Sequence, residues 1–172
     1  MTAPATPADL FARLAELGIA APTVEHTAAF TVEEGEQHVG HLPGVHIKNL
    51  FLCDAKKRMW LVVAPWDRRI DLKTLPELIG AARLSFGSAD RLLRVLGVTP
   101  GSVTPFAVIN DPTRQVQVIL DAWMMSQALI NAHPLINTMT TTITSADLTK
   151  FMAACGHAPR VLPLARTAAQ PL

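Results

Sequence analysis

The sequence predicts an α/β (α+β) fold: one domain, with helices packed on a mixed, mainly antiparallel sheet. Helix start and stop signals alternate along the chain with short apolar runs typical of strands. Two pairs of these runs flank polar, turn-forming segments, as strands of β-hairpins do. The 172 residues, 49% of them hydrophobic, suit a single domain with one core and no need for disulfide staples.

Five segments carry helix signals. The first, residues 7–17, follows a Thr6 cap with Pro7 at its first position and ends at Gly18. The second, residues 31–38, opens with the capping-box sequence Thr-Val-Glu-Glu. The remaining three expected helices are 72–79, 89–96 after a Ser88 cap, and 145–155 with Ser145 as the cap.

Strands are expected in the apolar runs between these helices. Residues 47–52 and 59–64 flank the polar turn Asp54–Arg58, which predicts a hairpin, and a short extended piece at 24–26 precedes it. Residues 106–109 and 116–120 flank a second turn-forming segment, 110–114, which predicts a second hairpin. Residues 129–132 and 137–144 add further sheet, and a tail that frays is expected from about residue 165.

Composition and charge exclude several classes of protein. A net charge of +1 argues against a large basic surface for nucleic acid and leaves room for a small local contact. No apolar run approaches the roughly 20 residues that span a bilayer, and no secretory signal is recognised, so we expect no membrane association and a cytoplasmic location. Cys53 and Cys155 are too few for a disulfide framework and are expected to be core thiols.

Common catalytic motifs are absent from the sequence. It contains no Gly-x-Ser-x-Gly elbow, Walker loop or His-Glu-x-x-His pair. His38, His41 and His46 lie close together but have no acidic or cysteine partner at a ligand spacing, so no metal site is expected. Taken alone, a strand lysine such as Lys48 usually points into water, and His133 before a proline reads as a hydrogen-bonded core or turn histidine.

Four stretches, in order and with their spacing, resemble one known family. They are EHTAAFTVEE, LPGVHIKNLFL, the segment from Gly101 to Pro105 followed by FAVIND, and HPLINTMTTTI. Together they resemble the YbaK/ProX family of aminoacyl-tRNA editing domains, free-standing relatives of the editing insertion of bacterial prolyl-tRNA synthetase. The resemblance implies an enzyme that hydrolyses amino acids wrongly esterified to tRNA, with no cofactor or metal. The sequence Lys-Asn-Leu-Phe-Leu resembles the branch that clears alanine from proline tRNA.

The resemblance also implies site residues. Lys48 matches the family's essential lysine, Asn49 its neighbour in this branch, and His133 the histidine of the His-Pro element, which makes these three the catalytic candidates. The chain departs from the family at Ile47, where a small polar residue is common, and at Ala132, where glycine is frequent. The expected substrate-binding residues are Gly101, Ser102, Pro105, Ile47 and Thr27.

Ester hydrolysis requires a positioned water and stabilisation of negative charge on the carbonyl oxygen. Lys48 could supply that charge to the carbonyl or to a substrate phosphate, and a substrate ribose hydroxyl could help activate water. Successive strand residues point to opposite faces, so Asn49 reaches the same substrate only if the strand twists, bulges or ends there. His133 is expected to shape the pocket through hydrogen bonding rather than to act as an obligatory base.

The expected partner is the acceptor end of mischarged tRNA, and physical association with prolyl-tRNA synthetase stays open. A synthetase that holds proline cannot exclude the smaller alanine sterically, so a second, smaller site is needed to remove it. Two alternatives remain: a deacylase of Ser-, Thr- or Cys-tRNA in the same family, or a non-catalytic module that binds tRNA or the synthetase.

Overall fold

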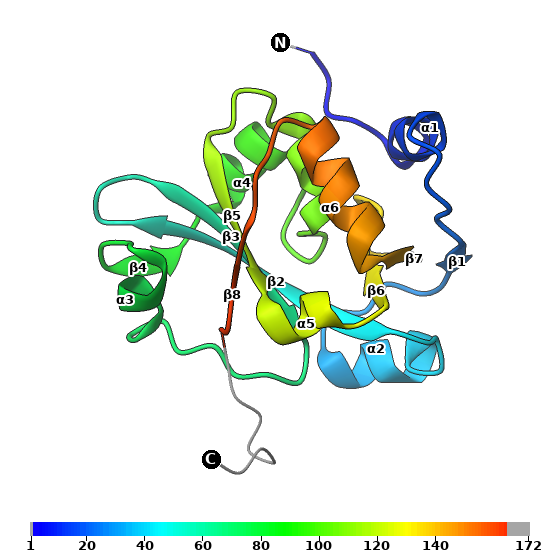
Figure 1. Ribbon diagram of the computed structural model, residues 1–172, viewed down its shortest axis with the longest axis horizontal. Helices are drawn as coiled ribbons and strands as arrows, with labels where there is room; N and C mark the ends of the chain where they lie inside the picture. Colours follow the sequence, from blue (N-terminus) through cyan, green and yellow to red (C-terminus); the bar gives the residue numbers. More distant parts are fainter. Residues whose placement is uncertain (1, 165–172) are drawn as a thin grey trace.

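A computed structural model describes residues 2–164 of the chain, which form one mixed sheet with helices packed on it (Figure 1). In this described part the strand order is β1-β7-β6-β2-β3-β5-β8, and β4 also pairs with β2. The strands are β1 (Thr23–Glu25), β2 (Val45–Asp54), β3 (Met59–Pro65), β4 (Leu84–Phe86), β5 (Val116–Asp121), β6 (Leu129–Ala132), β7 (Met139–Thr144) and β8 (Arg160–Leu162). The predicted fold class is confirmed. The predicted tail lies outside the described residues.

Strand β2 joins the two halves of the sheet. One of its edges pairs antiparallel with β3, from Ile47 opposite Pro65 to Cys53 opposite Met59, and confirms the first predicted hairpin. Its other edge pairs with β6 through residues 45–46 and with β4 through residues 52–54. Among the described pairings, residues 47–50 therefore have a neighbouring strand only on the β3 side. This leaves a gap in the sheet where Lys48 and its neighbours lie.

The start of β2 depends on a glycine. Gly44 has φ +105°, and a Cβ there would lie 2.8 Å from both Cβ and the carbonyl oxygen of Leu129. Glycine alone tolerates both the conformation and the close approach. The chain can therefore enter β2 directly beside β6, where Val45 pairs with Ile130 in parallel.

The prediction of a second hairpin, from residues 106–109 and 116–120, is wrong. Residues 105–110 form a 3₁₀ helix, η1 (Pro105–Asn110), and β5 pairs in parallel with β3. Thr104 accepts a hydrogen bond from the Phe106 amide and Pro105 occupies the first helical position, both of which favour a helical turn. A short, largely buried apolar run has no alternation to distinguish strand from helix. The turn predicted at residues 110–114 is nevertheless present: the side chain of buried Asp111 accepts hydrogen bonds from the amides of Gln115 and Val116.

The helices largely follow their predicted limits. They are α1 (Pro7–Glu16), α2 (Val32–Val39), α3 (Leu75–Ile79), α4 (Ala89–Leu96), α5 (Ala122–Ser126) and α6 (Ser145–Ala154). The capping box at Thr31 and Glu34 is formed. Most limits agree to within one residue, but α3 begins three residues later than expected, and Thr144 rather than Ser145 caps α6. Helix α5 and strands β4 and β8 were not predicted; each is five residues or shorter, which leaves little local signal.

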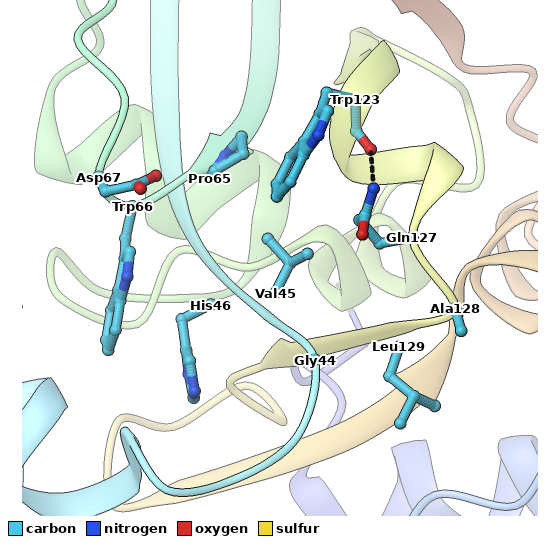
Figure 2. A pocket seen from close by; sticks show the side chains of 10 residues that line it. All are labelled: Gly44, Val45, His46, Pro65, Trp66, Asp67, Trp123, Gln127, Ala128 and Leu129. Atoms are coloured by element: carbon cyan, nitrogen blue, oxygen red, sulfur yellow. Dashed lines mark hydrogen bonds between the residues drawn. The ribbon is translucent and has the colours of Figure 1, made fainter. Parts of the chain in front are cut away.

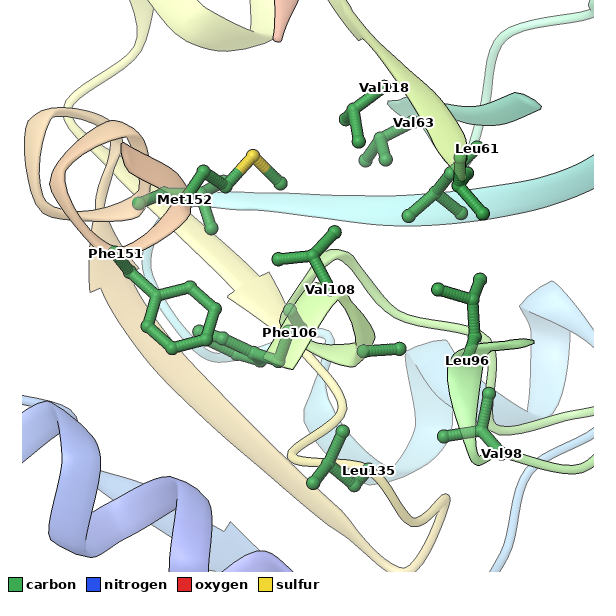
Figure 3. Close-up of a cluster of buried hydrophobic side chains, with 14 of the residues drawn as sticks. Leu61, Val63, Leu96, Val98, Phe106, Val108, Val118, Leu135, Phe151 and Met152 are labelled. Carbon is green, nitrogen blue, oxygen red and sulfur yellow. The ribbon is translucent and has the colours of Figure 1, made fainter. Parts of the chain in front are cut away.

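Two apolar clusters hold the domain together. In the larger, Phe106 and Val108 of η1 pack against Phe151 and Met152 of α6 and against β3 side chains such as Val63 (Figure 3). The Phe106 and Phe151 rings meet edge to face, 5.5 Å between centroids. The smaller cluster surrounds buried residues of β2, β3 and α3: Leu52, Trp60, Val62, Leu75 and Ile79.

The two cysteines lie in and beside the larger apolar cluster. Cys53 is buried and Cys155 half-buried, and both are free thiols. In the described part of the chain, every helix is too short or too polar to cross a bilayer.

Candidate functional site

The gap in the sheet opens into a cavity of about 180 Å³. The loop before α2 and α2 itself form one wall, and β2, β6 and the residues after them form the others. Its polar lining groups come from segments far apart in sequence: His26, Thr31, His46, Lys48, Asn49, Asn131, His133 and Thr140. All three predicted catalytic residues therefore meet in one cavity.

Ile47, Lys48 and Asn49 are consecutive, yet all three line the cavity. Alternating side chains of a regular strand point to opposite faces of a sheet. Here the cavity lies at the edge of β2 that has left β6 and has not yet reached β4, so side chains from both faces can reach it. This open edge removes the conflict that strand alternation raised for Asn49.

Lys48 is a half-buried cation. Burial lowers the pKa of its ammonium group below the ordinary 10.5, and attraction to the Asp67 carboxylate partly offsets this effect. A charge removed from bulk water interacts more strongly with a developing oxyanion or a phosphate than an exposed charge does.

Asn49 carries an unused acceptor. Its Oδ1 atom is buried and has no hydrogen-bond partner among the described residues. Leaving such an atom unpaired is costly, about 1–3 kcal/mol. A bound water or a substrate donor would remove this cost, which suits a role in positioning the attacking water.

His133 is held in one orientation. Its Nδ1 lies 2.9 Å from the carbonyl oxygen of Met139, so Nδ1 donates the proton and the neutral ring presents Nε2 as an acceptor. Burial lowers its pKa, the Met139 carbonyl opposes that shift, and nearby His26 adds to it. The ring is therefore mainly neutral at neutral pH.

His26 was not among the predicted site residues. Its Nδ1 donates to the Thr27 carbonyl oxygen at 2.8 Å, which leaves Nε2 to accept from the Thr140 hydroxyl, also at 2.8 Å. Its ring stacks on His38, with centroids 5.8 Å apart, and lies 6.2 Å from the His133 ring. The only sequence signal for it was its place in the EHTAAF stretch.

The other predicted binding residues do not line the cavity, although Gly101 and Thr27 contact residues that do. Gly101, with φ +90°, lies so close to Phe30 that a Cβ would be 3.3 Å from the Phe30 ring, and Phe30 lines the cavity while remaining 74% exposed. Ser102 and Pro105 are buried, and Thr27 supplies a carbonyl to His26. Their substrate-binding roles stay predictions.

The clustered histidines do not form a metal site. Within residues 2–164, no three His, Cys, Asp or Glu side chains are arranged to hold a metal ion. His38 stacks on His26, and His46 stacks on Trp66 with ring centroids 4.3 Å apart. Ring stacking thus accounts for both side chains.

Comparisons with known proteins identify the family of this chain. The model of the aminoacyl-tRNA editing domain family matches residues 26–151. The chain is 40% identical over 156 residues to the prolyl-tRNA editing protein ProX of Acetoanaerobium sticklandii, covering 90% of this chain and 95% of that one. It is also 40% identical over 162 residues to prolyl-tRNA synthetase associated domain-containing protein 1 of Danio rerio, covering 91% and 88%.

A solved structure supports the fold. It is described as a candidate trans-editing enzyme for prolyl-tRNA synthetase and superposes with a TM-score of 0.72 at 20% identity, covering 95% of this chain and 99% of that chain. At this identity the likeness concerns the fold, whereas the family model and the relatives bear on descent. The chain belongs to the aminoacyl-tRNA editing domain family, of the YbaK/ProX type that its motifs resemble.

Proposed function

We propose that this protein is a trans-editing deacylase that hydrolyses Ala-tRNA(Pro) to alanine and free tRNA. The observation that carries the proposal is the meeting of Lys48, Asn49 and His133 in one small cavity of an editing-domain fold. The relatives named for prolyl-tRNA editing support the reaction class and the tRNA. The Lys-Asn-Leu-Phe-Leu sequence of β2 supports alanine as the amino acid.

The cavity residues suit ester hydrolysis. Water adds to the carbonyl carbon, the bond to the ribose oxygen breaks, and that oxygen leaves with a proton. The Lys48 ammonium stabilises the oxyanion or anchors the adjacent phosphate, and Asn49 Oδ1 accepts a hydrogen bond from the water. The neighbouring ribose hydroxyl of the substrate relays the proton: it accepts one from the attacking water and passes its own to the departing ribose oxygen. His133, anchored to Met139, shapes the wall.

Size explains which amino acid is removed. Ile47 and Ala132 narrow the cavity with apolar side chains, where the family often has smaller or polar ones. The methyl side chain of alanine fits into a cavity narrowed in this way, whereas the proline ring would overlap its wall. Steric overlap discriminates between two amino acids more strongly than the absence of one methylene group does. Correctly charged Pro-tRNA(Pro) is thereby spared.

The partner is the acceptor end of the tRNA, and the site of action is the cytoplasm, where tRNA is charged. A net charge of +1 suits a contact confined to that end. Activity on free mischarged tRNA would require no complex with the synthetase.

A panel of mischarged tRNAs tests the proposal. We expect rapid deacylation of Ala-tRNA(Pro), little of Pro-tRNA(Pro), and loss of most activity in Lys48→Ala with a melting temperature close to wild type. Lys73→Ala, which removes an exposed lysine, is the matched control. Efficient clearance of Ser-, Thr- or Cys-tRNA without Ala-tRNA(Pro) would reassign the substrate, and binding without any turnover would identify a non-catalytic module.

A further inference from the structure

A second cavity, of about 480 Å³, adjoins the first, and His46 and Trp66 line both. Figure 2 shows its lining: Trp123 projects from α5 towards Pro65 and Val45, and the Trp66 ring lies beside His46. Its volume is more than twice that of the first cavity. None of the predicted catalytic residues lines it, so the deacylation mechanism leaves it unexplained.

Two indole rings give this cavity aromatic surfaces held in fixed positions. Trp66 stacks on His46 with an interplanar angle of 21°. Trp123 is 39% exposed, and the guanidinium of Arg68, itself only 4% exposed, lies 4.3 Å from its ring centroid. The cation lies over the indole, and the exposed part of this ring offers a surface on which a planar ligand can stack. Nucleobases of unpaired strands bind proteins by such stacking on aromatic rings.

Polar groups beside these rings can bond the edge of a base. The carboxylate of Asp67 and the amide of Gln127 line the cavity, and the amide nitrogen of Gln127 is directed at the Trp123 carbonyl oxygen, 3.4 Å away (Figure 2). His46 Nε2 is buried and has no hydrogen-bond partner among the described residues. A carboxylate acceptor beside an amide can hydrogen-bond the exocyclic amino group and ring nitrogens of a purine.

We infer that this second cavity binds the adenine base of the 3′-terminal nucleotide of the tRNA. The inference rests on the proposed function: in an aminoacyl-tRNA the amino acid and the terminal base are joined to the same ribose. An aminoacyl group in the first cavity therefore places the base one sugar ring away, and the second cavity adjoins the first through their shared lining residues His46 and Trp66. Asp67, which lines the second cavity, also acts electrostatically on Lys48, which lines the first.

Binding of uncharged tRNA(Pro) with and without its terminal adenosine tests this assignment without any turnover. Wild-type protein should bind the shortened tRNA about 5- to 100-fold more weakly, the range expected for loss of one stacked base. Trp123→Ala should bind both tRNAs equally, at the level of wild type with the shortened tRNA, and Trp123→Phe should keep the preference. Phe86→Ala, which removes an aromatic side chain that is 65% exposed on β4, is the control and should behave as wild type.

A terminal 2-aminopurine in place of adenine gives a direct reading of stacking. Its fluorescence should be quenched by wild-type protein and much less by Trp123→Ala with an unchanged melting temperature. Wild-type protein that ignores the terminal adenosine, or Trp123→Ala that retains the full preference, would overturn the inference. The proposed function can fail independently of this inference. If binding depends on the terminal adenosine but no mischarged tRNA is deacylated, the proposed enzyme activity is wrong and the base site stands. If Ala-tRNA(Pro) is deacylated but binding does not depend on the terminal adenosine, the base site is wrong and the proposed activity stands.

Discussion

At the scale of single residues, the charge of Lys48 is set by two opposing neighbourhood effects. Burial favours its neutral form, and Asp67 favours the charged form. If the ammonium stabilises the oxyanion or a phosphate, activity must follow the protonated fraction of this one side chain. The pH at which activity declines therefore reports the electrostatics of the site.

We expect the deacylation rate, corrected for spontaneous ester hydrolysis, to decrease as the pH rises. The midpoint of this decrease should lie below 10.5, the ordinary pKa of lysine. Asp67→Asn should move this decline to lower pH, because it removes the charge that raises the Lys48 pKa. Rate profiles of the two proteins measure the shift. A decline at the same pH in both would show that another group controls activity.

Ile47 offers a test of size selection. It lines the cavity and also packs against the larger core cluster, so Ile47→Ala should lower stability by about 2 kcal/mol while enlarging the cavity. Deacylation of Pro-tRNA(Pro) should rise relative to Ala-tRNA(Pro), about tenfold for the relief of one overlap. Steady-state rates and denaturant titration separate the two effects. Unchanged selectivity in a folded variant would contradict the steric model.

At the scale of elements, the turn between β2 and β3 is organised by one carboxylate. The buried side chain of Asp54 accepts hydrogen bonds from the amides of Lys56, Arg58 and Ala82 and from Arg58 Nε. Burial raises the pKa of this carboxyl group, but these bonds and the Arg58 charge outweigh burial and lower it to about 2. This turn sets the β2–β3 register, which in turn places Lys48 at the open edge.

Asp54→Ala should destabilise the protein by about 3 kcal/mol, since it leaves several buried donors and a charged partner unpaired. Asp71→Ala is the matched control, because the exposed side chain of Asp71 accepts a hydrogen bond from the Lys73 amide. Folding lowers the Asp54 pKa, so its contribution is complete above about 3.8 and is lost as the pH falls through about 2. Equal denaturation midpoints for the two variants would refute this role.

At the scale of the whole molecule, the candidate site lies where the two halves of the sheet join. The β1, β6 and β7 half contributes His133 and Thr140, and β2 contributes Lys48 and Asn49. Two partly buried histidines, His46 and His133, lie at this junction, and burial is the main cause that lowers the pKa of each. Protonating them opposes the folded state.

Stability should therefore fall as the pH drops below about 6.5, the ordinary histidine value. In that window the unfolded chain binds more protons than the folded one, so its relative free energy decreases with falling pH. Melting temperatures from about pH 7.5 to about 5 should show a shallower decline in His133→Gln than in wild type. Parallel curves for wild type and His133→Gln would contradict the prediction.

The sequence alone was enough for the parts of the fold that local signals control. Caps such as Thr6 and Thr31, the stop at Gly97 and the first hairpin all appear where predicted. Family membership was equally readable, because four motifs keep their order and spacing. The meeting of Lys48, Asn49 and His133 followed from that resemblance, and strand alternation by itself argued against it.

Only the tertiary structure decided the rest. Residues 106–109 became helical and β5 became parallel to β3 because burial on all sides removes the periodicity that distinguishes strand from helix. His26 and Trp66 reach the cavity, and Trp123 the neighbouring one, from segments far apart in the chain. Caps and turns depend on contacts across three to five residues, whereas a cavity is defined by which distant side chains the packed sheet brings together.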